Sequence, residues 1–407
     1  MAELRPFAAY RPPSDLVSRV ACPPYDVVST ERARTLAAGV PESFLHVTRG
    51  EIDLPEGADP HGDAVYAKCR ENLDAMVAQG WLAADATPRL YVYRQRQGRH
   101  RQTGVVACAS VAAYLEGRIK KHEKTRPDKE DDRTRHIEAL AAHAEPVFLT
   151  YRAVPAIDEA IGRVTDRDPE VDFEVAGEGV RHQVWMVEGA AAGVLERLFD
   201  ERVDALYVAD GHHRSAAAAR VHQAHRGDGR AHDGFLAVVF PHDQMNILAY
   251  NRLVKDAAGR GRDELLAALR ERLDVVRTDA PPPDVHGAFG LYLGEDQWYR
   301  ATALPGSFDP EDPVRSLDGQ VCQDLILGPI FGVQDPRRDR QLDFVGGVYG
   351  AEGLQRPVDR GDADLAIYLH PTEMEQIMRV SDLGAVLPPK STWFEPKLRS
   401  GLFVHRF

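Results

Sequence analysis

Residues 206–219 (LYVADGHHRSAAAA) place an aspartate, a glycine, two histidines and an arginine between an apolar run and an alanine-rich run. This pattern predicts a strand that ends at Asp210, a turn at Gly211 and a helix after it. Free N–H groups and the positive end of a helix dipole favour a bound anion. Gly211 allows the backbone to approach a phosphate closely, and Arg214 adds a bidentate donor. The segment therefore predicts a phosphate-binding turn.

Two other interpretations of this segment stay open. In the first, Asp210 only caps the helix and the histidines are solvated. In the second, histidines bind a metal ion. Five histidines lie close together in this part of the sequence: His212, His213, His222, His225 and His232. Adjacent histidines on a helix point about 100° apart, so His212 and His213 cannot both bind one ion without distortion.

A second group of charged residues begins at His122, and it suggests acid–base chemistry. Glu123 is a candidate general base, and His122, Lys124 and Arg133 are candidate partners for an anion. A carboxylate that removes a hydroxyl proton beside cations that absorb phosphoryl charge is what a small-molecule kinase requires. His122 is thereby included among the catalytic candidates, with Glu123 and Asp210.

The helix predicted over 128–143 carries Asp132, Arg133 and His136 on one side. Ile137 and Leu140, the residues expected to face the core, lie on that same side. Charged groups on such a stripe are costly unless they are paired. They therefore form either a buried structural network or the lining of a cleft, and the cleft interpretation makes Arg133 and His136 substrate-binding residues.

Two short segments near the N-terminus supply further candidate substrate-binding residues. Tyr25 and Asp26 follow two prolines, which fix the backbone and give the carboxylate and the phenol a rigid position. A purely structural turn is the alternative. His46 and Thr48 lie in a strand-like run, where a period of two places them on the same side and predicts that they line a cleft.

The C-terminal stretch 388–401 combines prolines with cationic and hydroxyl side chains. Its Lys-Ser-Thr sequence resembles the end of a P-loop, but the glycine-rich turn is missing, so we reject a Walker A motif. Lys390, Ser391 and Lys397 are nevertheless predicted to clamp a carboxylate or phosphate of the substrate. A surface loop is the alternative.

The elements that must position these residues alternate along the chain. Helices are predicted over 30–37, 63–79, 128–143, 154–163, 190–199 and 212–225. Strands are predicted over 90–96, 103–111, 146–151, 181–188, 205–209, 234–240 and 364–369. Mixed strands and helices indicate an α/β (mixed α+β) fold. We place a boundary near residue 255, which gives an α/β region over 1–255 and an α+β region over 256–407.

Composition limits the possible functions. The chain has 407 residues, 43% hydrophobic and 28% charged, which is typical of a globular protein. With 50 Lys and Arg against 63 Asp and Glu, the net charge is −13, which argues against a protein that coats nucleic acid or an anionic membrane. Four widely spaced cysteines exclude a disulfide scaffold and a cysteine-rich zinc site. No signal-peptide or membrane-spanning run is evident, so we expect a cytoplasmic protein with no membrane partner.

The chain is similar to the DUF1015 family, which is sometimes labelled SpoOJ/ParB-like. The matching landmarks are PPYDV at 23–27, SFLHVTR at 43–49, EIDLP at 51–55, HEKT at 122–125, DRxxH at 132–136, ADGHHR at 209–214, YNR at 250–252 and the stretch 388–401. The DGHHR segment also resembles the phosphate-binding motif of the ParB/sulfiredoxin-like superfamily, which includes the ATP- or ADP-dependent free serine kinases.

This resemblance implies a ParB/sulfiredoxin-like nucleotide-binding core with additional α/β regions. It assigns Gly211, His212, His213 and Arg214 to nucleotide phosphates, and it makes Asp210 a candidate for catalysis or for holding a metal-bound phosphate. The implied cofactors are Mg²⁺ and ATP or ADP, with pyrophosphate as a further donor.

The function that we expect is a phosphotransferase acting on a small hydroxylated metabolite, with free L-serine as the leading candidate. A ParB-type nucleotide-dependent regulator or DNA-partitioning protein is the alternative, and a histidine-ligated metal hydrolase is the second alternative. The sequence predicts neither the donor, the acceptor, nor the oligomeric state.

Overall fold

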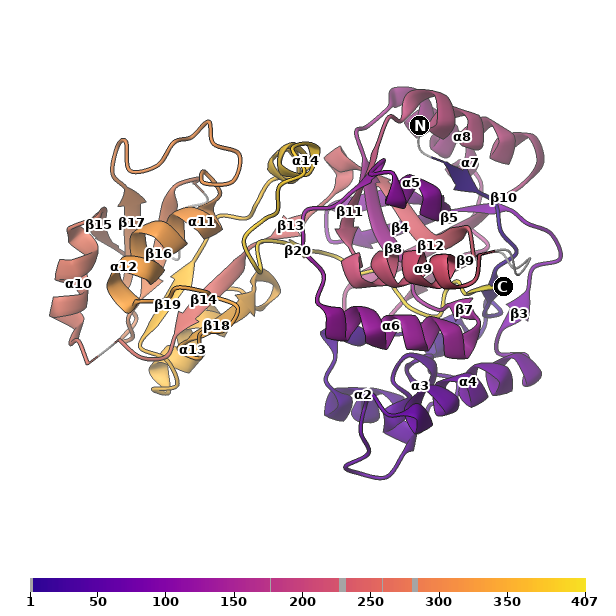
Figure 1. Ribbon diagram of the computed structural model, residues 1–407, viewed down its shortest axis with the longest axis horizontal. Coiled ribbons are helices and arrows are strands. Elements are labelled where there is room, and N and C mark those ends of the chain that lie inside the picture. The colour runs from indigo at the N-terminus through magenta and orange to yellow at the C-terminus, as the bar shows by residue number, and fades with distance from the viewer. Residues whose placement is uncertain (1–2, 176, 227–231, 258, 280–284) are drawn as a thin grey trace. The chain divides into compact units, whose positions relative to one another are not determined.

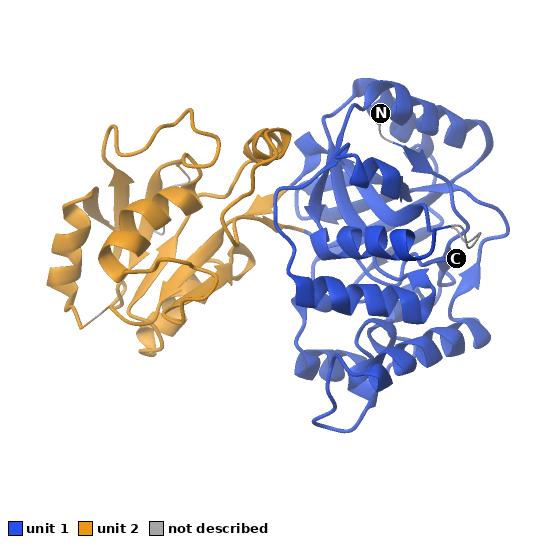
Figure 2. Cartoon of the chain, viewed as in Figure 1, with its two compact units in different colours: residues 1–245, 396–407 blue, residues 246–395 orange. Residues whose placement is uncertain are grey.

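The computed structural model describes residues 3–175, 177–226, 232–257, 259–279 and 285–407. The chain forms two compact units, shown in Figure 1 and coloured separately in Figure 2. Unit 1 comprises residues 1–245 and 396–407, and unit 2 comprises residues 246–395. The sequence predicts a single boundary near residue 255. In the structure, unit 2 is instead inserted into unit 1, so that the last residues of the chain return to unit 1.

Unit 1 is built on a nine-stranded mixed sheet. Its strand order is β6-β11-β8-β12-β5-β4-β10-β9, and β1 pairs with β5. The strands are β1 Leu4–Arg5, β4 Leu90–Gln97, β5 His100–Ser110, β6 Ile119–Lys120, β8 Val147–Tyr151, β9 Val171–Glu174, β10 Val180–Val187, β11 Leu206–Asp210 and β12 Gly234–Pro241. Strand β11 is parallel to β6, and β12 is parallel to β8, whereas the other neighbours are antiparallel. The predicted mixed α/β class is confirmed.

Helices cover this sheet in successive layers. The helices of unit 1 are α1 Val17–Val20, α2 Thr30–Ala37, α3 Leu45–Thr48, α4 Asp63–Ala78, α5 Val111–Leu115, α6 Pro127–Leu140, α7 Pro155–Thr165, α8 Gly189–Arg202 and α9 His212–Ala224. Short 3-10 turns lie at η1 Tyr25–Val27, η2 Gly50–Asp53 and η3 His242–Gln244. Helix α9 packs on β8 and β12, α6 packs on α9, and α4 packs on α6 (Figure 1). Two-stranded ribbons pair β2 Tyr10–Arg11 with β3 Ala83–Ala84, and β7 Ala142–His143 with β21 His405–Arg406.

The alanine-rich sequence of α9 explains its central position. Ala218 and Ala219 belong to the core formed with the sheet, whereas Ala217 and Val221 pack against Ile137 of α6. Small side chains permit close approach on both sides, so α9 is buried between the sheet and α6. This packing fixes the N-terminus of α9 at the end of β11, where the predicted phosphate-binding turn lies.

Unit 2 contains a six-stranded antiparallel sheet in the order β15-β17-β16-β19-β14-β18. Its strands are β14 Tyr250–Val254, β15 Leu273–Thr278, β16 Ala288–Tyr292, β17 Trp298–Ala303, β18 Leu342–Gly346 and β19 Leu365–Tyr368, and β13 Ile247–Leu248 pairs separately with β20 Trp393–Phe394. Its helices are α10 Arg262–Arg270, α11 Asp318–Cys322, the π-helical turn Gln323–Leu327, α12 Gly328–Phe331, the 3-10 turn η5 Gly347–Tyr349, α13 Glu352–Asp359 and α14 Met374–Asp382. Alternate strand residues face two cores: Val254 packs with α10, and Leu253 packs with α13.

Candidate functional site

The junction between β11 and α9 has the geometry that the sequence predicts. Gly211 is the N-cap of α9 with a φ of +96°, and no side chain caps the helix. A β-carbon at this position would lie 3.2 Å from the Arg214 guanidinium and 3.4 Å from the Cα of Val147. Glycine is therefore required both by the left-handed backbone and by the space below it. The first-turn N–H groups of α9 have no partners within the helix, so this end favours a negative charge.

Asp210 is held in place at this turn. Its Oδ1 accepts the Gly211 N–H at 2.8 Å, and its Oδ2 accepts a hydrogen bond from Lys397 Nζ at 3.0 Å. Partial burial alone would raise the pKa of Asp210, but Lys397 and Arg214 outweigh this effect and keep the pKa below its usual range. Asp210 is thus a fixed carboxylate ion at neutral pH.

Arg214 lies beneath the turn rather than above it. The side chain is 9% exposed, its Nη1 donates to the Pro146 carbonyl, and its Nη2 lies 3.7 Å from both the Asp26 and the Asp210 carboxylates. The sequence suggested a fork that grips a phosphate directly. In the structure, the donors of Arg214 face protein acceptors, because the absent β-carbon of Gly211 leaves room for the guanidinium there.

The two histidines of the motif point in different directions. His212 is buried and packs edge-on against His122, with ring centroids 4.4 Å apart, while its Nδ1 lies 3.7 Å from the Glu123 carboxylate. His213 Nε2 accepts the N–H of Arg126 at 3.2 Å. Burial lowers the pKa of His122 to about 4 and keeps that of His212 well below its usual value. His122 is therefore neutral at pH 7 and adds no positive charge for an anion.

Glu123 and Lys124 lie in the loop between β6 and α6. The Glu123 side chain is 56% exposed, and Lys124 is also exposed. The predicted base is thus accessible from solvent beside His212, on the rim of the turn.

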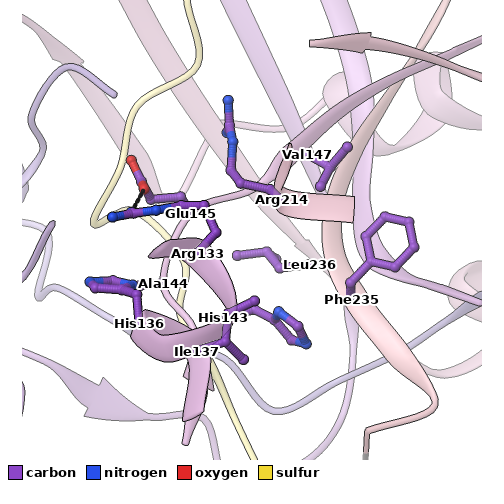
Figure 3. Close-up of a pocket in the computed structure, with 10 residues that line it drawn as sticks. All are labelled: Arg133, His136, Ile137, His143, Ala144, Glu145, Val147, Arg214, Phe235 and Leu236. Atoms are coloured by element: carbon purple, nitrogen blue, oxygen red, sulfur yellow. Dashed lines mark ion pairs between the residues drawn. The ribbon is translucent and has the colours of Figure 1, made fainter. Parts of the chain in front are cut away.

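A buried network of charges lies behind the turn. Arg133 forms a salt bridge to Asp132 at 2.7 Å and lies 3.6 Å from Glu145, an ion pair that Figure 3 shows. The Arg133 guanidinium also stacks on the Tyr25 ring at 3.9 Å. Glu145 accepts the Tyr25 N–H at 3.1 Å and the Ser400 hydroxyl at 2.8 Å. Burial raises the pKa of Glu145, against the opposing effects of Arg214 and Arg133.

A polar cavity of about 120 Å³ opens next to this network. Four of the predicted substrate-binding residues line it: Tyr25, Thr48, Arg133 and His136. His136 Nε2 lies 3.0 Å from the Val47 carbonyl, and burial lowers the pKa of His136 to about 3. Asp26, which follows Tyr25, faces Arg214 instead. Of these two adjacent residues, Tyr25 therefore belongs to the cavity and Asp26 to the turn.

Other predicted residues lie elsewhere. His46 pairs with Asp53 at 2.9 Å and does not line the cavity of Thr48. The strand-like run expected here was wrong, because these residues form α3, in which alternate residues do not share a side. Lys390 and Ser391 belong to unit 2, where Ser391 donates to the Pro388 carbonyl and Lys390 lies over the Tyr250 ring. Of the three predicted clamp residues, Lys397 alone belongs to unit 1, with the turn.

Sequence reasoning missed Glu145 and Glu51, and it gave Arg49 and Ser400 no individual role, although both lie in segments that it singled out. Arg49 and Glu51 stand in the two family landmarks at 43–49 and 51–55, so those segments carried a signal for them. Glu145 lies alone before Pro146, and nothing in its neighbourhood marks it as the partner of two arginines.

The described residues offer no group of three or more His, Cys, Asp or Glu side chains arranged to hold a metal ion. His222 contacts the His232 carbonyl, and His225 stacks on the His232 ring at 5.1 Å, so the histidines near the motif do not assemble a ligand set in this part of the chain. Among the helices that the structure describes, none combines the length and the apolar character needed to cross a membrane.

Residues 4–320 match the model of the family described as "Protein of unknown function (DUF1015)". A stretch of 129 residues is 31% identical to the porphobilinogen deaminases of Mycobacterium marinum and Mycolicibacterium paratuberculosis. This stretch is 30% of the chain, and it spans only 40% of the length of those curated relatives.

Solved structures with a similar arrangement include a free serine kinase variant in complex with AMP, which is 15% identical. Its TM-score is 0.34, and the match covers 72% of this chain and 87% of that one. A C-terminally truncated SbnI from Staphylococcus aureus is 13% identical, with a TM-score of 0.37 and coverage of 74% and 87%. A conserved hypothetical protein from Pyrococcus furiosus is 14% identical, with a TM-score of 0.35 and coverage of 74% and 95%.

Proposed function

We propose that this chain, which belongs to the DUF1015 family, is a nucleotide-dependent phosphotransferase whose acceptor is a small hydroxylated metabolite, with free L-serine as the first candidate. One observation carries the proposal: the N-terminus of α9 begins at Gly211 without a capping side chain, beside Lys397 and above Arg214. Helix N-termini of this kind bind phosphate through first-turn N–H groups. The nucleotide phosphates would contact the backbone of His212 and His213.

The two cations have different roles in this proposal. Lys397 is 20% exposed, and its hydrogen bond to Asp210 holds its ammonium group at the turn. Because an ammonium group has three N–H donors, Lys397 can also donate to a phosphate oxygen there. Arg214 is buried, so it acts as a fixed positive charge below the turn. Fixed charges in a poorly hydrated site stabilise developing phosphoryl charge more strongly than charges in water do.

The acceptor hydroxyl needs a base. Its oxygen forms a bond to the transferred phosphorus, the bond from phosphorus to the leaving nucleotide oxygen breaks, and the hydroxyl proton passes to a carboxylate. Asp26 is the best placed candidate, because its side chain is 37% exposed and lies 3.7 Å from Arg214 at the turn. Glu123 is the second candidate, on the rim beside His212. Asp210 is less suited as a base, because its two cationic neighbours lower its proton affinity.

The residues present fit Mg²⁺ bound together with a nucleotide. Mg²⁺ is usually held by one or two carboxylates, with phosphates and waters completing its shell. Asp210 lies at the turn and is kept ionised by Lys397 and Arg214, and its carboxylate keeps acceptor sites beyond the contacts described. When bound there, the ion would neutralise charge on the phosphates.

The test combines binding with transfer. We would measure thermal shifts of the full chain with ATP, ADP and pyrophosphate, each with and without Mg²⁺, and would follow phosphoserine formation by ³¹P NMR. A ligand at 100 times its Kd adds about 2.7 kcal/mol, which is a shift of a few degrees for a chain of this size. Lys397→Met should lose most of this shift. Arg220→Met is the matched control, because Arg220 is on the same helix about 12 Å from its N-terminus.

Asp26→Asn should retain nucleotide binding and lose transfer. Full transfer in both Asp26→Asn and Glu123→Gln would contradict the proposed mechanism. The absence of any nucleotide shift would overturn the proposed function. Nucleotide binding without transfer to any hydroxylated acceptor would favour the ParB-type regulator instead.

A further inference from the structure

The cavity beside Arg133 is a partly enclosed, polar space within unit 1, and the exposed His61 and the half-buried Lys129 form part of its wall. It lies among α2, α3, η2, α4 and α6, and its volume is about 120 Å³. This is room for several waters, but it is well below the 300–1,000 Å³ of sites that hold drug-sized ligands. The cavity therefore suits a metabolite of amino-acid size and excludes a nucleotide. We call it the Arg49 cavity, and these residues line it: Tyr25, Thr30, Thr48, Arg49, Glu51, Pro60, His61, Val65, Tyr66, Cys69, Lys129, Asp132, Arg133 and His136.

Two arginines that line the cavity each have one buried guanidinium nitrogen without a hydrogen-bond partner. These are Nε of Arg49 and Nη1 of Arg133, and Arg133 as a whole is only 6% exposed. The nearest acid to Arg133 Nη1 is Glu145, at 3.6 Å, which is an ion pair but is too long for a hydrogen bond. A buried donor without a partner destabilises the fold by about 1–3 kcal/mol. Oxygens of a bound anion would remove that cost from both arginines.

Acidic groups lie in the same wall. Glu51 is buried, and its Oε1 accepts from the Thr30 hydroxyl at 3.1 Å and pairs with Arg49 at 3.1 Å. A carboxylate has about four acceptor sites, so Glu51 retains capacity for a further donor. Asp132 is different, because His61, Tyr66 and Arg133 already occupy both of its oxygens. A ligand that carries a cationic group would therefore turn that group towards Glu51.

We propose that the Arg49 cavity binds a small zwitterionic carboxylate, with its carboxylate on Arg49 and Arg133 and its ammonium group on Glu51. The inference rests on the proposed function in one respect: it gives the charge class of the acceptor. It goes further by assigning recognition to Arg49 and Glu51. Tyr25 lines the cavity, and the next residue in the chain, Asp26, faces Arg214 at the turn.

The experiment measures binding without nucleotide, so that it does not depend on transfer. Isothermal titration of the full chain would compare L-serine, glycolate, a hydroxy acid that is one carbon shorter and lacks the ammonium group, and ethanolamine, which lacks the carboxylate. L-serine should bind best, glycolate about tenfold or more weakly, and ethanolamine not measurably, because each charged hydrogen bond lost weakens binding by at least about that factor.

Variants separate the two ends of the ligand. Arg49→Gln should weaken L-serine and glycolate alike, whereas Glu51→Gln should weaken L-serine and leave glycolate unchanged. Because Arg49 also donates to the Val28 carbonyl, its variant can lose stability. Thr30→Met is the second variant, since it narrows the cavity from a partly exposed position. Arg70→Gln, on the exposed side of α4, is the matched control and should bind as the unmodified chain does.

The outcomes distinguish this inference from the proposed function. Binding of none of the three probes, or L-serine binding that Arg49→Gln and Thr30→Met both leave unchanged, would overturn the cavity assignment. L-serine binding that both variants weaken, without phosphate transfer from any donor, would support the cavity and contradict the phosphotransferase. Phosphate transfer with the same acceptor KM in Arg49→Gln, Glu51→Gln and Thr30→Met would support the phosphotransferase and contradict the cavity assignment.

Discussion

Replacing Gly211 by alanine tests the turn most directly. An L-residue in the left-handed region costs about 1–2 kcal/mol, and at this position the new β-carbon would also meet the Arg214 guanidinium at 3.2 Å and the Val147 backbone at 3.4 Å. Arg214 would have to shift by a few tenths of an ångström, which would weaken its contacts to Pro146 and Asp26. We expect a total loss of about 2–4 kcal/mol in the stability of unit 1.

Gly39→Ala is the matched control. Gly39 also has a positive φ of +71°, but a β-carbon there would meet nothing within 4 Å, so only the backbone cost of about 1–2 kcal/mol applies. Urea unfolding, with hydrogen exchange at the α9 amides to report on unit 1 alone, would measure both variants. ADP titration would follow the effect on the phosphate site. Equal losses in the two variants, with ADP affinity unchanged in Gly211→Ala, would refute the claim that this glycine is needed for the site.

Three further predictions concern the charges around the turn. Glu145→Gln should reduce stability by about 3–5 kcal/mol in urea unfolding, because it leaves two buried arginines short of a counter-charge, whereas Ser400→Ala should cost only about 1 kcal/mol. Lys397→Met should raise the pKa of Asp210, which a carboxyl NMR titration measures, and an unchanged titration would contradict the pairing. The pKa of His136 is lowered to about 3 in the folded chain, whereas it is about 6.5 in the unfolded chain. As the pH falls below about 6.5, His136 is therefore protonated in the unfolded chain but not in the folded chain. His136 alone should therefore lower the stability by about 3 kcal/mol between pH 7 and pH 4, and His136→Gln should reduce the pH dependence measured by urea unfolding by about that amount.

Much of the secondary structure could be predicted because the hydrophobic periodicity of a segment and the turn residues at its ends indicated the same element. Gly80 ends the predicted helix that becomes α4, and the run 97–98 separates the strands that become β4 and β5. The β11–α9 junction was predicted correctly because three signals coincide within a few residues: an apolar run, a glycine and an alanine-rich helix. Where only one weak signal was present, as at 45–48, the prediction was wrong. Phe44, Leu45, Val47 and Thr48 are all buried, and this spacing of three and four residues fits a helical turn rather than a strand.

The path of the chain could not be predicted from composition. Residues 396–407 return to unit 1, and this return brings Lys397 to Asp210 and Ser400 to Glu145. Lys390, only a few residues earlier, remains in unit 2. The prediction that Lys390, Ser391 and Lys397 act together was based on their proximity in sequence. The boundary between the units falls inside this stretch, after residue 395, and separates Lys397 from the other two.

The direction in which Arg214 points also required the structure. Sequence spacing places Arg214 in the first turn of α9, but it does not say whether the side chain faces a ligand or the interior. The interior position is set by partners that are distant in sequence, namely Pro146 and Asp26. An arginine paired with protein carboxylates supplies charge and rigidity at the turn, and this leaves the backbone N–H groups and Lys397 as the groups able to contact a phosphate. Since backbone N–H groups survive side-chain substitution, variants of the histidines alone should affect nucleotide affinity less than Gly211→Ala does, and a larger loss in His213→Ala would place the phosphate on the side chains instead.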